Sequence, residues 1–494
     1  MSEAPESHLE AARRDALAQL RAGGQEPYAY RYERSHTAAE ALAAFRPDHE
    51  APVRVAGRLV AIRGHGKTTF AHLEDPSGRI QLYFRRDDVG ERAYAVVTLL
   101  HLGDIVGVQG TLFVTRTGEI TIRVADLTLL AKALRPLPLG KSDADGHQHG
   151  GLTDAETRYR QRYADLAVHP EVREVFRIRA RTISYLRRFL DDRGFLEVET
   201  PVLQPIYGGA MARPFVTHHL ALDRQLYLRI ATELYLKRCV VGGIERVYEI
   251  GKDFRNEGID RLHNPEFTML ELYQAYADYE DMMVLTEEMV DGVVQALYGT
   301  SRLERFGTTL DFTRPWRRAT YRDLVREHAG LDLAAADAAA LGRAVAARGT
   351  DPAGMSVPKL IDEIFKEYVE PRLEAPTFVV DFPIELSPLA KPKRGDPTLA
   401  ERFEFFVLGR ELANAFSELN DPDDQRRRLE LQVAARAAGD AEAQVMDDDY
   451  ILALEYGMPP TGGIGLGIDR LIMLLAERAS IRDVILFPQL RSDG

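Results

Sequence analysis

Residues 247–273, with the sequence VYEIGKDFRNEGIDRLHNPEFTMLELY, predict a strand, a polar loop and a returning strand. Because side chains alternate along a strand, the returning strand has two faces, one with Phe267, Met269, Glu271 and Tyr273 and the other with Thr268, Leu270 and Leu272. The outgoing strand likewise places on one face Asp253, Arg255 and Glu257. One face of the hairpin therefore combines aromatic rings, a guanidinium and several carboxylates, which is unusual for a purely structural strand.

The spacing on the returning strand indicates what this face can bind. Phe267 and Glu271 are four residues apart, which is about 13 Å at ~3.3 Å per residue. This is the span from a nucleotide base to the side chain of an amino acid attached to that nucleotide. An alternative interpretation is a half-exposed antiparallel hairpin with ordinary cross-strand ion pairs.

A second hairpin is predicted in residues 402–421, RFEFFVLGRELANAFSELND. Glu404 and Glu411 flank an expected tight turn at Leu408-Gly409, and alternation then puts on one face Asn414, Phe416 and Glu418. Two carboxylates without a neighbouring His or Cys suit a hard cation such as Mg²⁺, which binds through one or two carboxylates plus substrate phosphates. Surface charge is the alternative interpretation of this segment.

Residues 459–477, PPTGGIGLGIDRLIMLLAE, combine a glycine-rich stretch with an amphipathic helix that starts near Ile468. The glycines let the backbone pack closely. Arg470 falls in the first turn of this helix, where the helix dipole makes a cation unfavourable by ~0.3–1 kcal/mol. An anion that binds there would explain the arginine. The start of a core helix would explain the glycines alone.

The N-terminal part of the chain has a different pattern. From Val53 to about Leu134, short β-rich runs alternate with turn signals such as Pro76-Ser77-Gly78. Five strands, with one helical segment between the third and the fourth, predict a small all-β barrel of the oligonucleotide-binding (OB) type. In the Pro- and Gly-rich stretch that follows, His147 and His149 have no matched second pair of ligands, so a solvated linker is favoured over a metal site.

Composition sets outer limits on the protein. The 494 residues carry a formal net charge of −13, which taken alone argues against a nucleic-acid partner. Residues 51–135, however, hold 12 Lys and Arg against 8 Asp and Glu, a net +4, so the remainder carries −17. The single cysteine, Cys239, cannot form an internal disulfide, which indicates a reducing compartment such as the cytoplasm. No apolar run approaches the ~18 residues of a membrane span, so we expect no membrane association.

The segments FRNEG (254–258) and RLHNPEFTMLELYQAYADY (261–279) resemble motif 2 of the class II aminoacyl-tRNA synthetases. GLGIDRLIML (465–474) resembles their motif 3, and the helical segment 172–201 resembles motif 1. Within this class the chain is most similar to lysyl-tRNA synthetases, through GGAMARPF (208–215), ELYLKR (233–238), NAFSELND (414–421) and RDVILFP (482–488). It departs from the family pattern in a longer linker at 141–150 and in Thr232, which stands where proline is common.

The resemblance implies four regions: a helical extension (1–50), an OB-fold anticodon-binding domain (51–135), a linker (136–165) and an α+β class II catalytic domain with an antiparallel sheet flanked by helices (166–494). It implies ATP-dependent ligation of L-lysine to tRNA(Lys) through a lysyl-adenylate. It also implies a homodimer that forms through the motif 1 helix.

The resemblance also assigns roles to individual residues. Those for ATP are Arg255, Glu257, His263, Phe267 and Arg470, with Arg255 and Arg470 catalytic. Those for lysine are Gly209, Glu233, Glu271, Tyr273, Asn414, Phe416 and Glu418. Glu404 and Glu411 would bind Mg²⁺, and the anticodon would be read by Arg58, Phe70, Gln81 and Glu119.

The residues independently agree with lysine as the substrate. A substrate ammonium needs carboxylates and a phenol as acceptors, and Glu271, Glu418 and Tyr273 supply them. An aspartate pocket would instead need cations at these positions. Two other activities stay open: a lysyltransferase that modifies a protein such as elongation factor P, and a catalytically silent RNA-binding paralogue. Relatives of the first kind lack the barrel, and a silent paralogue would be expected to have lost a site Arg or Glu.

Overall fold

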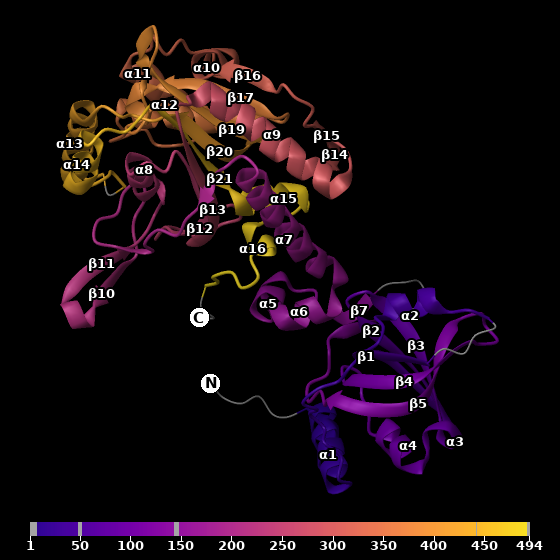
Figure 1. Cartoon of the computed structure of the whole chain (residues 1–494). Helices are drawn as coiled ribbons and strands as arrows, with labels where there is room; N and C mark the ends of the chain where they lie inside the picture. The colour runs from indigo at the N-terminus through magenta and orange to yellow at the C-terminus, as the bar shows by residue number, and fades with distance from the viewer. Residues whose placement is uncertain (1–6, 48–51, 143–147, 441, 492–494) are drawn as a thin grey trace. The chain divides into compact units, whose positions relative to one another are not determined.

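The computed structural model describes residues 7–47, 52–142, 148–440 and 442–491. The chain divides into two compact units, Met1–His169 and Pro170–Gly494 (Figure 1). His147 lies outside the described residues, and the candidate linker metal site is therefore not described.

The N-terminal unit is built on a closed five-stranded barrel with the strand order β1-β2-β3-β5-β4. The strands are β1 (Pro52–His65), β2 (Thr68–Asp75), β3 (Gly78–Arg85), β4 (Ile105–Val114) and β5 (Ile120–Ala131). Alternate side chains of β2 are buried, because the inward positions fill the barrel and the outward ones form its wall. This order and closure confirm the OB fold that the sequence predicts.

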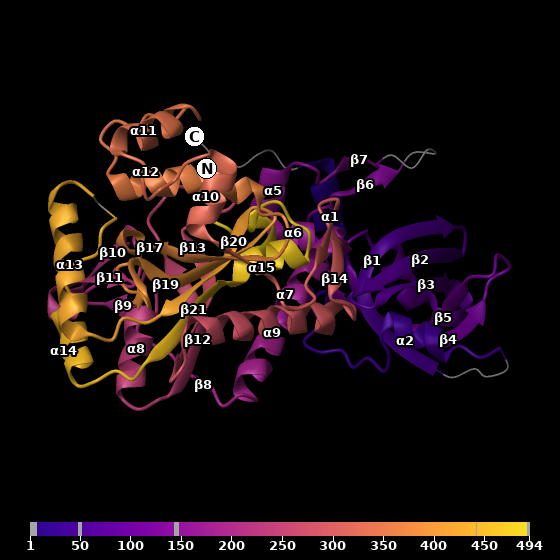
Figure 2. The ribbon, with the colours of Figure 1, turned by 90° about the horizontal axis from the view of Figure 1, so that it is seen from above.

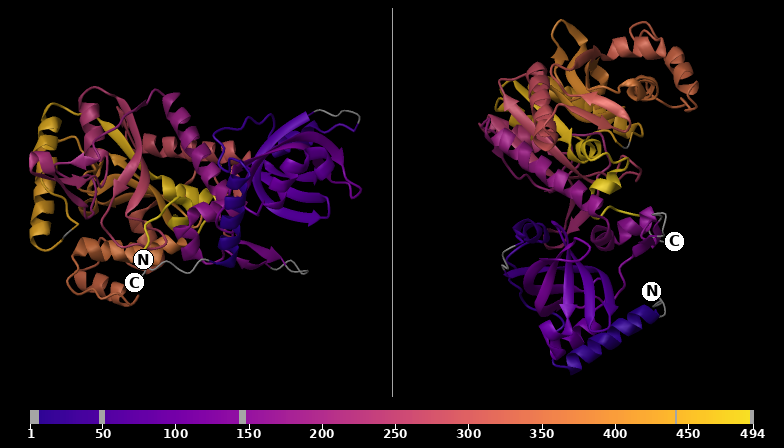
Figure 3. Two further views of the ribbon diagram at one scale, coloured as in Figure 1. Left: turned by 90° about the horizontal axis from the view of Figure 1, so that it is seen from below. Right: turned by 90° about the vertical axis from the view of Figure 1, so that its right-hand side faces the viewer.

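Short helices complete this unit. Two helices, α3 (Arg86–Val89) and α4 (Glu91–Thr98), stand between β3 and β4, where one helical segment was expected. Helix α1 (His8–Ala22) begins with a capping box at Ser7 and lies against the barrel (Figure 3), where Arg13 donates to the carbonyls of Leu102 and Ala133 at 2.8 and 3.0 Å. The remaining helix of the extension is α2 (Ala38–Ala44).

Residues 136–165, predicted as a linker, contain regular structure. Strands β6 (Leu139–Ser142) and β7 (Gln148–Gly151) pair as a hairpin, and helices α5 (Ala155–Arg160) and α6 (Arg162–Val168) follow. These elements belong to the N-terminal unit, which ends at His169.

The C-terminal unit is organised by a nine-stranded sheet in the order β16-β17-β19-β20-β21-β13-β12-β8, with β18 paired to β19. All its pairs are antiparallel except β16 with β17 and β12 with β8. Its strands are β8 (Leu196–Glu197), β12 (Arg246–Phe254), β13 (Glu266–Ala275), β16 (Arg317–Thr320), β17 (Thr377–Pro383), β18 (Pro392–Lys393), β19 (Asp396–Val407), β20 (Arg410–Ser417) and β21 (Thr461–Gly467).

Apolar helices cover one face of this sheet. Helix α9 (Tyr279–Tyr298) packs on β19, β20 and β21, and α15 (Ile468–Leu475) packs on β13 and β20. The motif 1 helix is α7 (Pro170–Asp191), which contacts α9, α15 and α16 (Ile481–Val484). Leu270 and Leu272 belong to the core under these helices, as the predicted alternation on β13 requires.

The other helices leave part of the opposite face open. Helix α8 (Glu233–Val241) packs on β12 and β13, and the pair α13 (Pro422–Ala437) and α14 (Asp448–Glu455) lies beside it (Figure 2). Helices α10 (Tyr321–Ala329), α11 (Ala338–Ala346) and α12 (Val357–Ile364) form a second core with β17. Smaller strands are β9 (Leu203–Gln204), β10 (Val216–His219) and β11 (Arg224–Leu228), in one sheet, and the hairpin of β14 (Arg302–Arg305) and β15 (Thr308–Asp311).

Candidate active site

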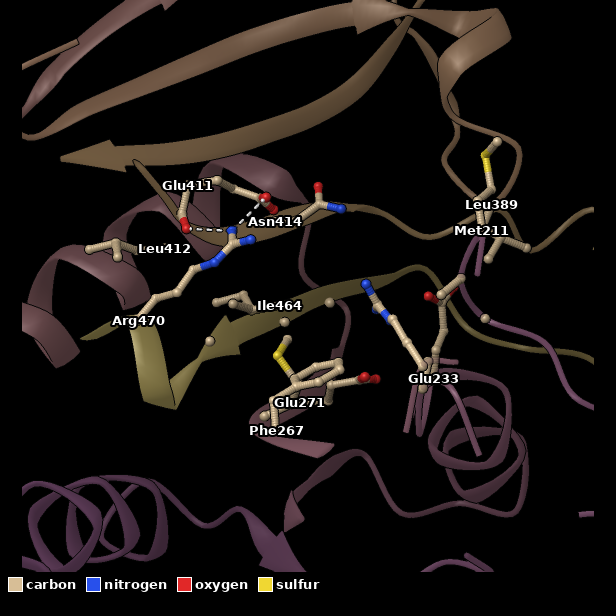
Figure 4. Close-up of a pocket in the computed structure, with 18 of the residues that line it drawn as sticks. Met211, Glu233, Phe267, Glu271, Leu389, Glu411, Leu412, Asn414, Ile464 and Arg470 are labelled. Atoms are coloured by element: carbon tan, nitrogen blue, oxygen red, sulfur yellow. Dashed lines mark hydrogen bonds and ion pairs between the residues drawn. The ribbon is translucent and has the colours of Figure 1, made fainter. Parts of the chain in front are cut away.

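A cavity of about 380 Å³ lies on the open face of the large sheet, over β13, β20 and β21. Figure 4 shows Arg470 and Glu411 toward one end of it and Glu233 and Met211 toward the other. Of the candidate site residues, the cavity is lined by Gly209, Glu233, Arg255, Glu257, His263, Phe267, Glu271, Tyr273, Glu411, Asn414, Phe416, Glu418 and Arg470. The structure thus gathers residues from five separate segments of the chain around one space.

One end of the cavity holds the cationic groups. The guanidinium of Arg255 lies 5.1 Å from the centre of the Phe267 ring. Arg470, in the first turn of α15, donates to the carbonyl and the carboxylate of Glu411 at 2.9 and 3.1 Å. Its other terminal nitrogen is 3.3 Å from Nε2 of His263, so the two side chains meet at this end. Two guanidiniums and an imidazole beside an aromatic ring suit a nucleotide and its phosphates.

The other end holds buried carboxylates. Glu271 accepts weakly from the Tyr273 hydroxyl, at 3.4 Å, and from the backbone N–H of Thr232, at 3.3 Å. Proline at position 232 could not supply that N–H, so this departure from the family pattern acts directly on a site carboxylate. Glu418 and Glu233 complete the group, and both are buried.

Burial changes the protonation of these groups. Burial and the negative charges of Asp253 and Glu233 raise the pKa of Glu271 to about 8. Burial also raises the pKa of Glu418 well above its ordinary value, although Lys237 opposes the shift. Without a substrate cation the pocket therefore holds protons that a bound ammonium would displace.

The absence of a side chain at Gly463 makes room for the Glu418 carboxylate and the Tyr273 ring. A Cβ on Gly463 would lie 2.0 Å from Oε1 of Glu418 and 2.5 Å from the Tyr273 ring. The predicted turn between β19 and β20 is also present, since Leu408 and Gly409 both have positive φ, 52° and 67°. These two features fix where Glu418 and Glu411 stand.

The two candidate metal ligands are placed differently. Glu411 lines the cavity, whereas Glu404 pairs with Arg402 at 2.6 Å and is not part of the lining. Burial, and next the charge of Glu411, raise the pKa of Glu404 to about 8. A divalent cation would relieve this repulsion, and carboxylate oxygens are the donors Mg²⁺ prefers, so the two residues fit such an ion. Within the described ranges no group of three or more His, Cys, Asp or Glu could hold a metal alone.

Three of the four barrel residues, Arg58, Phe70 and Gln81, lie on β1, β2 and β3, and Glu119 directly precedes β5. Gln81 donates to Glu119 at 2.7 Å, and His72 approaches the other oxygen of Glu119 at 3.0 Å. Arg58 donates to the carbonyl of Gly103 at 2.8 Å. These polar groups stand on the outer wall, where the edges of nucleotide bases could be read.

An aromatic row lies beside this polar row. The rings of Phe70 and Tyr83 are 4.8 Å apart, and Phe113 is 5.9 Å from Tyr83. Arg123 lies 5.1 Å from the Phe113 ring. Sequence analysis identified Phe70 alone, although alternation along β3 puts Tyr83 on the same face as Gln81. The register then pairs Tyr83 with Phe70.

Sequence analysis also missed Lys237. Its ammonium is completely buried behind the carboxylate end of the cavity. A buried Lys in the run ELYLKR has no clear sequence signal, because a Lys at that spacing is usually solvated.

The helices of the described part of the chain include none that is long and apolar enough to cross a membrane.

Comparison with known proteins agrees with the family that the sequence motifs resemble. The family model of class II tRNA synthetases (D, K and N) matches residues 154–491, and the OB-fold nucleic acid binding domain matches residues 53–130. The lysine–tRNA ligase of Pelotomaculum thermopropionicum is 55% identical over 484 residues, which cover 97% of this chain and 94% of the relative. That of Moorella thermoacetica is 54% identical over 98% of both chains. The chain therefore belongs to the lysine–tRNA ligase family of class II aminoacyl-tRNA synthetases.

Proposed function

We propose that this protein activates L-lysine with ATP and transfers it to tRNA(Lys), releasing pyrophosphate and AMP. The observation that carries the proposal is the polarity of the cavity, with Arg470 toward one end and Glu233 toward the other (Figure 4). Glu271 and Glu418 lie close to Glu233, and Arg255 lies beside Phe267. Phosphates and the lysine carboxylate suit the first end, and the lysine ammonium groups suit the second.

The first step is an in-line attack. The lysine carboxylate attacks the α-phosphorus of ATP and pyrophosphate leaves, which gives the lysyl-adenylate. Arg255 would hold the α-phosphate, Phe267 and Arg470 would enclose the adenine, and Glu257 would accept from its amino group. His263 and Arg470 would meet the outer phosphates. These residues position the reactants and stabilise the developing charge, and the step needs no protein nucleophile.

The second step transfers the aminoacyl group. The terminal ribose hydroxyl of the tRNA attacks the carbonyl carbon of the mixed anhydride, and AMP leaves. Through both steps, the ε-ammonium of lysine would be held by Glu271, Tyr273 and Glu418. The α-amino group would be bound by Gly209, Glu233 and Asn414. Phe416 would pack on the aliphatic part of the lysine side chain. Mg²⁺ held by Glu404 and Glu411 would neutralise phosphate charge.

The barrel wall would select the tRNA. Arg58, Gln81 and Glu119 would read anticodon bases, and Phe70 would stack on one of them. The barrel also argues against a lysyltransferase that modifies a protein, since such relatives lack it. We further propose a cytoplasmic homodimer that assembles through α7.

Aminoacylation of purified tRNA tests this function. The protein should form lysyl-tRNA with lysine and ATP, and Arg255→Ala should abolish lysine-dependent ATP–pyrophosphate exchange. A protein that charges no tRNA but lysylates a partner protein would contradict the proposal. Near-normal exchange by Arg255→Ala would contradict the assigned site.

A further inference from the structure

The carboxylate end of the cavity contains a cation of its own. Lys237 has an exposed fraction of 0%, and its Nζ lies 2.6 Å from Oε1 of Glu233. The same ammonium forms an ion pair with Oε2 of Glu418. It also lies 5.4 Å from the centre of the Phe416 ring and 5.9 Å from that of Tyr273. A lysine side chain thus already occupies an ammonium site beside the proposed lysine pocket.

Lys237 does not itself line the cavity, whereas Glu233 and Glu418 do. Its ammonium therefore holds these two carboxylates from behind. Oε1 of Glu418, the oxygen that Lys237 does not pair with, is buried and has no hydrogen-bond partner among the described residues. An unpaired buried carboxylate oxygen is costly, so it indicates a site for a donor that arrives with the substrate.

At the carboxylate end of the cavity, the number of carboxylates can be compared with the number of ammonium groups. Its carboxylates are Glu233, Glu271 and Glu418, and Lys237 supplies one positive charge. Free lysine at neutral pH brings two ammonium groups, and its carboxylate would lie at the Arg255 end. Three buried carboxylates would then face three ammonium groups. Burial alone would lower the pKa of Lys237, but Glu233 and Glu418 outweigh it and raise that pKa, so the ammonium keeps its charge.

We propose that Lys237 is a positioning residue that completes this charge balance and orients Glu233 and Glu418 for the two ammonium groups of the substrate. The inference rests on the proposed function and extends it to the basis of lysine affinity. Without the Lys237 charge, one buried carboxylate would stay uncompensated or take up a proton. Either result weakens binding of a substrate with two ammonium groups.

The test compares Lys237→Gln with Lys237→Arg in lysine-dependent ATP–pyrophosphate exchange. Loss of one partner of a buried charge pair should raise the KM for lysine at least ~30-fold in Lys237→Gln. The KM for ATP should stay within about twofold, because Arg255 and Arg470 are untouched. Lys237→Arg keeps the charge and should retain a lower lysine KM than Lys237→Gln. Equal KM values for wild type and Lys237→Gln would overturn the inference, as would equal losses in the two variants.

Chemical rescue separates charge from shape. Lys237→Ala removes three carbons and the ammonium, which propylammonium reproduces. Propylammonium should lower the lysine KM of Lys237→Ala, while propanol should not, and wild type should show no gain from either. Rescue by propanol, or by neither compound, would indicate that the packing of Lys237 matters rather than its charge.

Lys132→Met provides a matched control. Lys132 is also fully buried and pairs with Asp104 at 2.7 Å, but it belongs to the barrel. Its loss should lower the melting temperature and leave the lysine KM of exchange unchanged.

If the neutral Lys237 variants fail to fold, the double variant Lys237→Met with Glu418→Gln removes one charge of each sign and should regain thermal stability over Lys237→Met alone. No regain would overturn the charge balance. Wild type inactive in exchange would instead contradict the proposed function.

Discussion

At the scale of single residues, burial decides the chemistry of the pocket. Glu271 lies close to Asp253 and Glu233, and the hydrogen bonds that it accepts from Thr232 N–H and Tyr273 are long. A carboxyl group in such surroundings is stabilised by a substrate cation far more than an exposed one would be. Burial of the carboxylates thus increases the discrimination against neutral amino acids, which would leave them unpaired.

Lysine binding should depend on pH through Glu271. Its pKa of about 8 means that the carboxyl is protonated at pH 7 and must lose its proton when the ammonium binds. As the pH rises toward this pKa, the KM for lysine should fall about tenfold per pH unit, and above the pKa it should level off. Titration calorimetry in buffers of different ionisation enthalpy should detect proton release on lysine binding at pH 7. Glu271→Gln is the control and should lose this proton release; release that persists in it would place the titrating group elsewhere.

Gly463→Ala should weaken lysine binding selectively. The new Cβ would stand 2.0 Å from Glu418 Oε1, so the carboxylate or the strand must move. Overpacking of this kind costs about 1–3 kcal/mol, which corresponds to roughly a 5- to 150-fold higher lysine KM. Gly342→Ala is the control, because its Cβ would meet only ordinary contacts, at 3.7 Å from Pro352. A lysine KM that did not change in Gly463→Ala would mean that Glu418 does not bind lysine.

At the scale of elements, one buried ion pair joins α7, α15 and β13. Asp469 accepts from Arg179 of α7 at 2.5 Å and from the backbone N–H of Thr268 at 2.6 Å. Arg179 also donates to Oγ1 of Thr268 at 2.8 Å. Since Asp469 and Thr268 adjoin Arg470 and Phe267 in the sequence, this contact sets the spacing of the two groups that would enclose the adenine.

Arg179→Met should therefore impair ATP binding from a distance. The substitution leaves Asp469 buried without its partner, which costs about 3–5 kcal/mol of unfolding free energy. We expect a higher KM for ATP than for wild type and a smaller change in the KM for lysine. Arg187→Met, on the same helix as Arg179, removes an exposed pair with Glu197 of β8 and should cost only about 0–1 kcal/mol. Equal effects of the two variants on the ATP KM would rule out the proposed link.

At the scale of the whole molecule, the charge is unevenly distributed. The net charge of −13 combines a region of +4 at residues 51–135 with −17 in the rest. The acidic part needs carboxylates for a cationic substrate, and the basic part carries the wall with the aromatic row. Net charge alone is therefore a poor guide to a nucleic-acid partner.

Phe70→Ala should affect tRNA and leave adenylate formation intact. Loss of one stacked base costs about 1–3 kcal/mol, so the KM for tRNA should rise roughly 5- to 150-fold. Exchange of ATP and pyrophosphate, which needs no tRNA, should be unchanged. Tyr30→Ala removes a fully exposed aromatic ring of the same unit and should alter neither value. Unchanged charging by Phe70→Ala would move the anticodon site away from this wall.

Local pattern was enough to predict much of the site. Alternation on β13 places Phe267, Met269, Glu271 and Tyr273 toward the cavity, as expected. The turn at Leu408-Gly409 needs two residues with positive φ, and the sequence indicates it directly. Both depend on neighbouring residues alone, which is why they can be predicted without a tertiary structure.

The sequence by itself determined the barrel, the strand faces and the family of this protein, because period, turn residues and motifs are local properties. Only the tertiary structure decided which carboxylates share a cation. Lys237 and Glu233 pair within α8, four residues apart. Glu418 follows β20 some 180 residues later, so its pair with Lys237 depends on how the sheet folds. It also decided that Glu404 pairs with Arg402 and stands outside the cavity lining. Burial and charge pairing are properties of contacts between distant segments, and local pattern does not specify them.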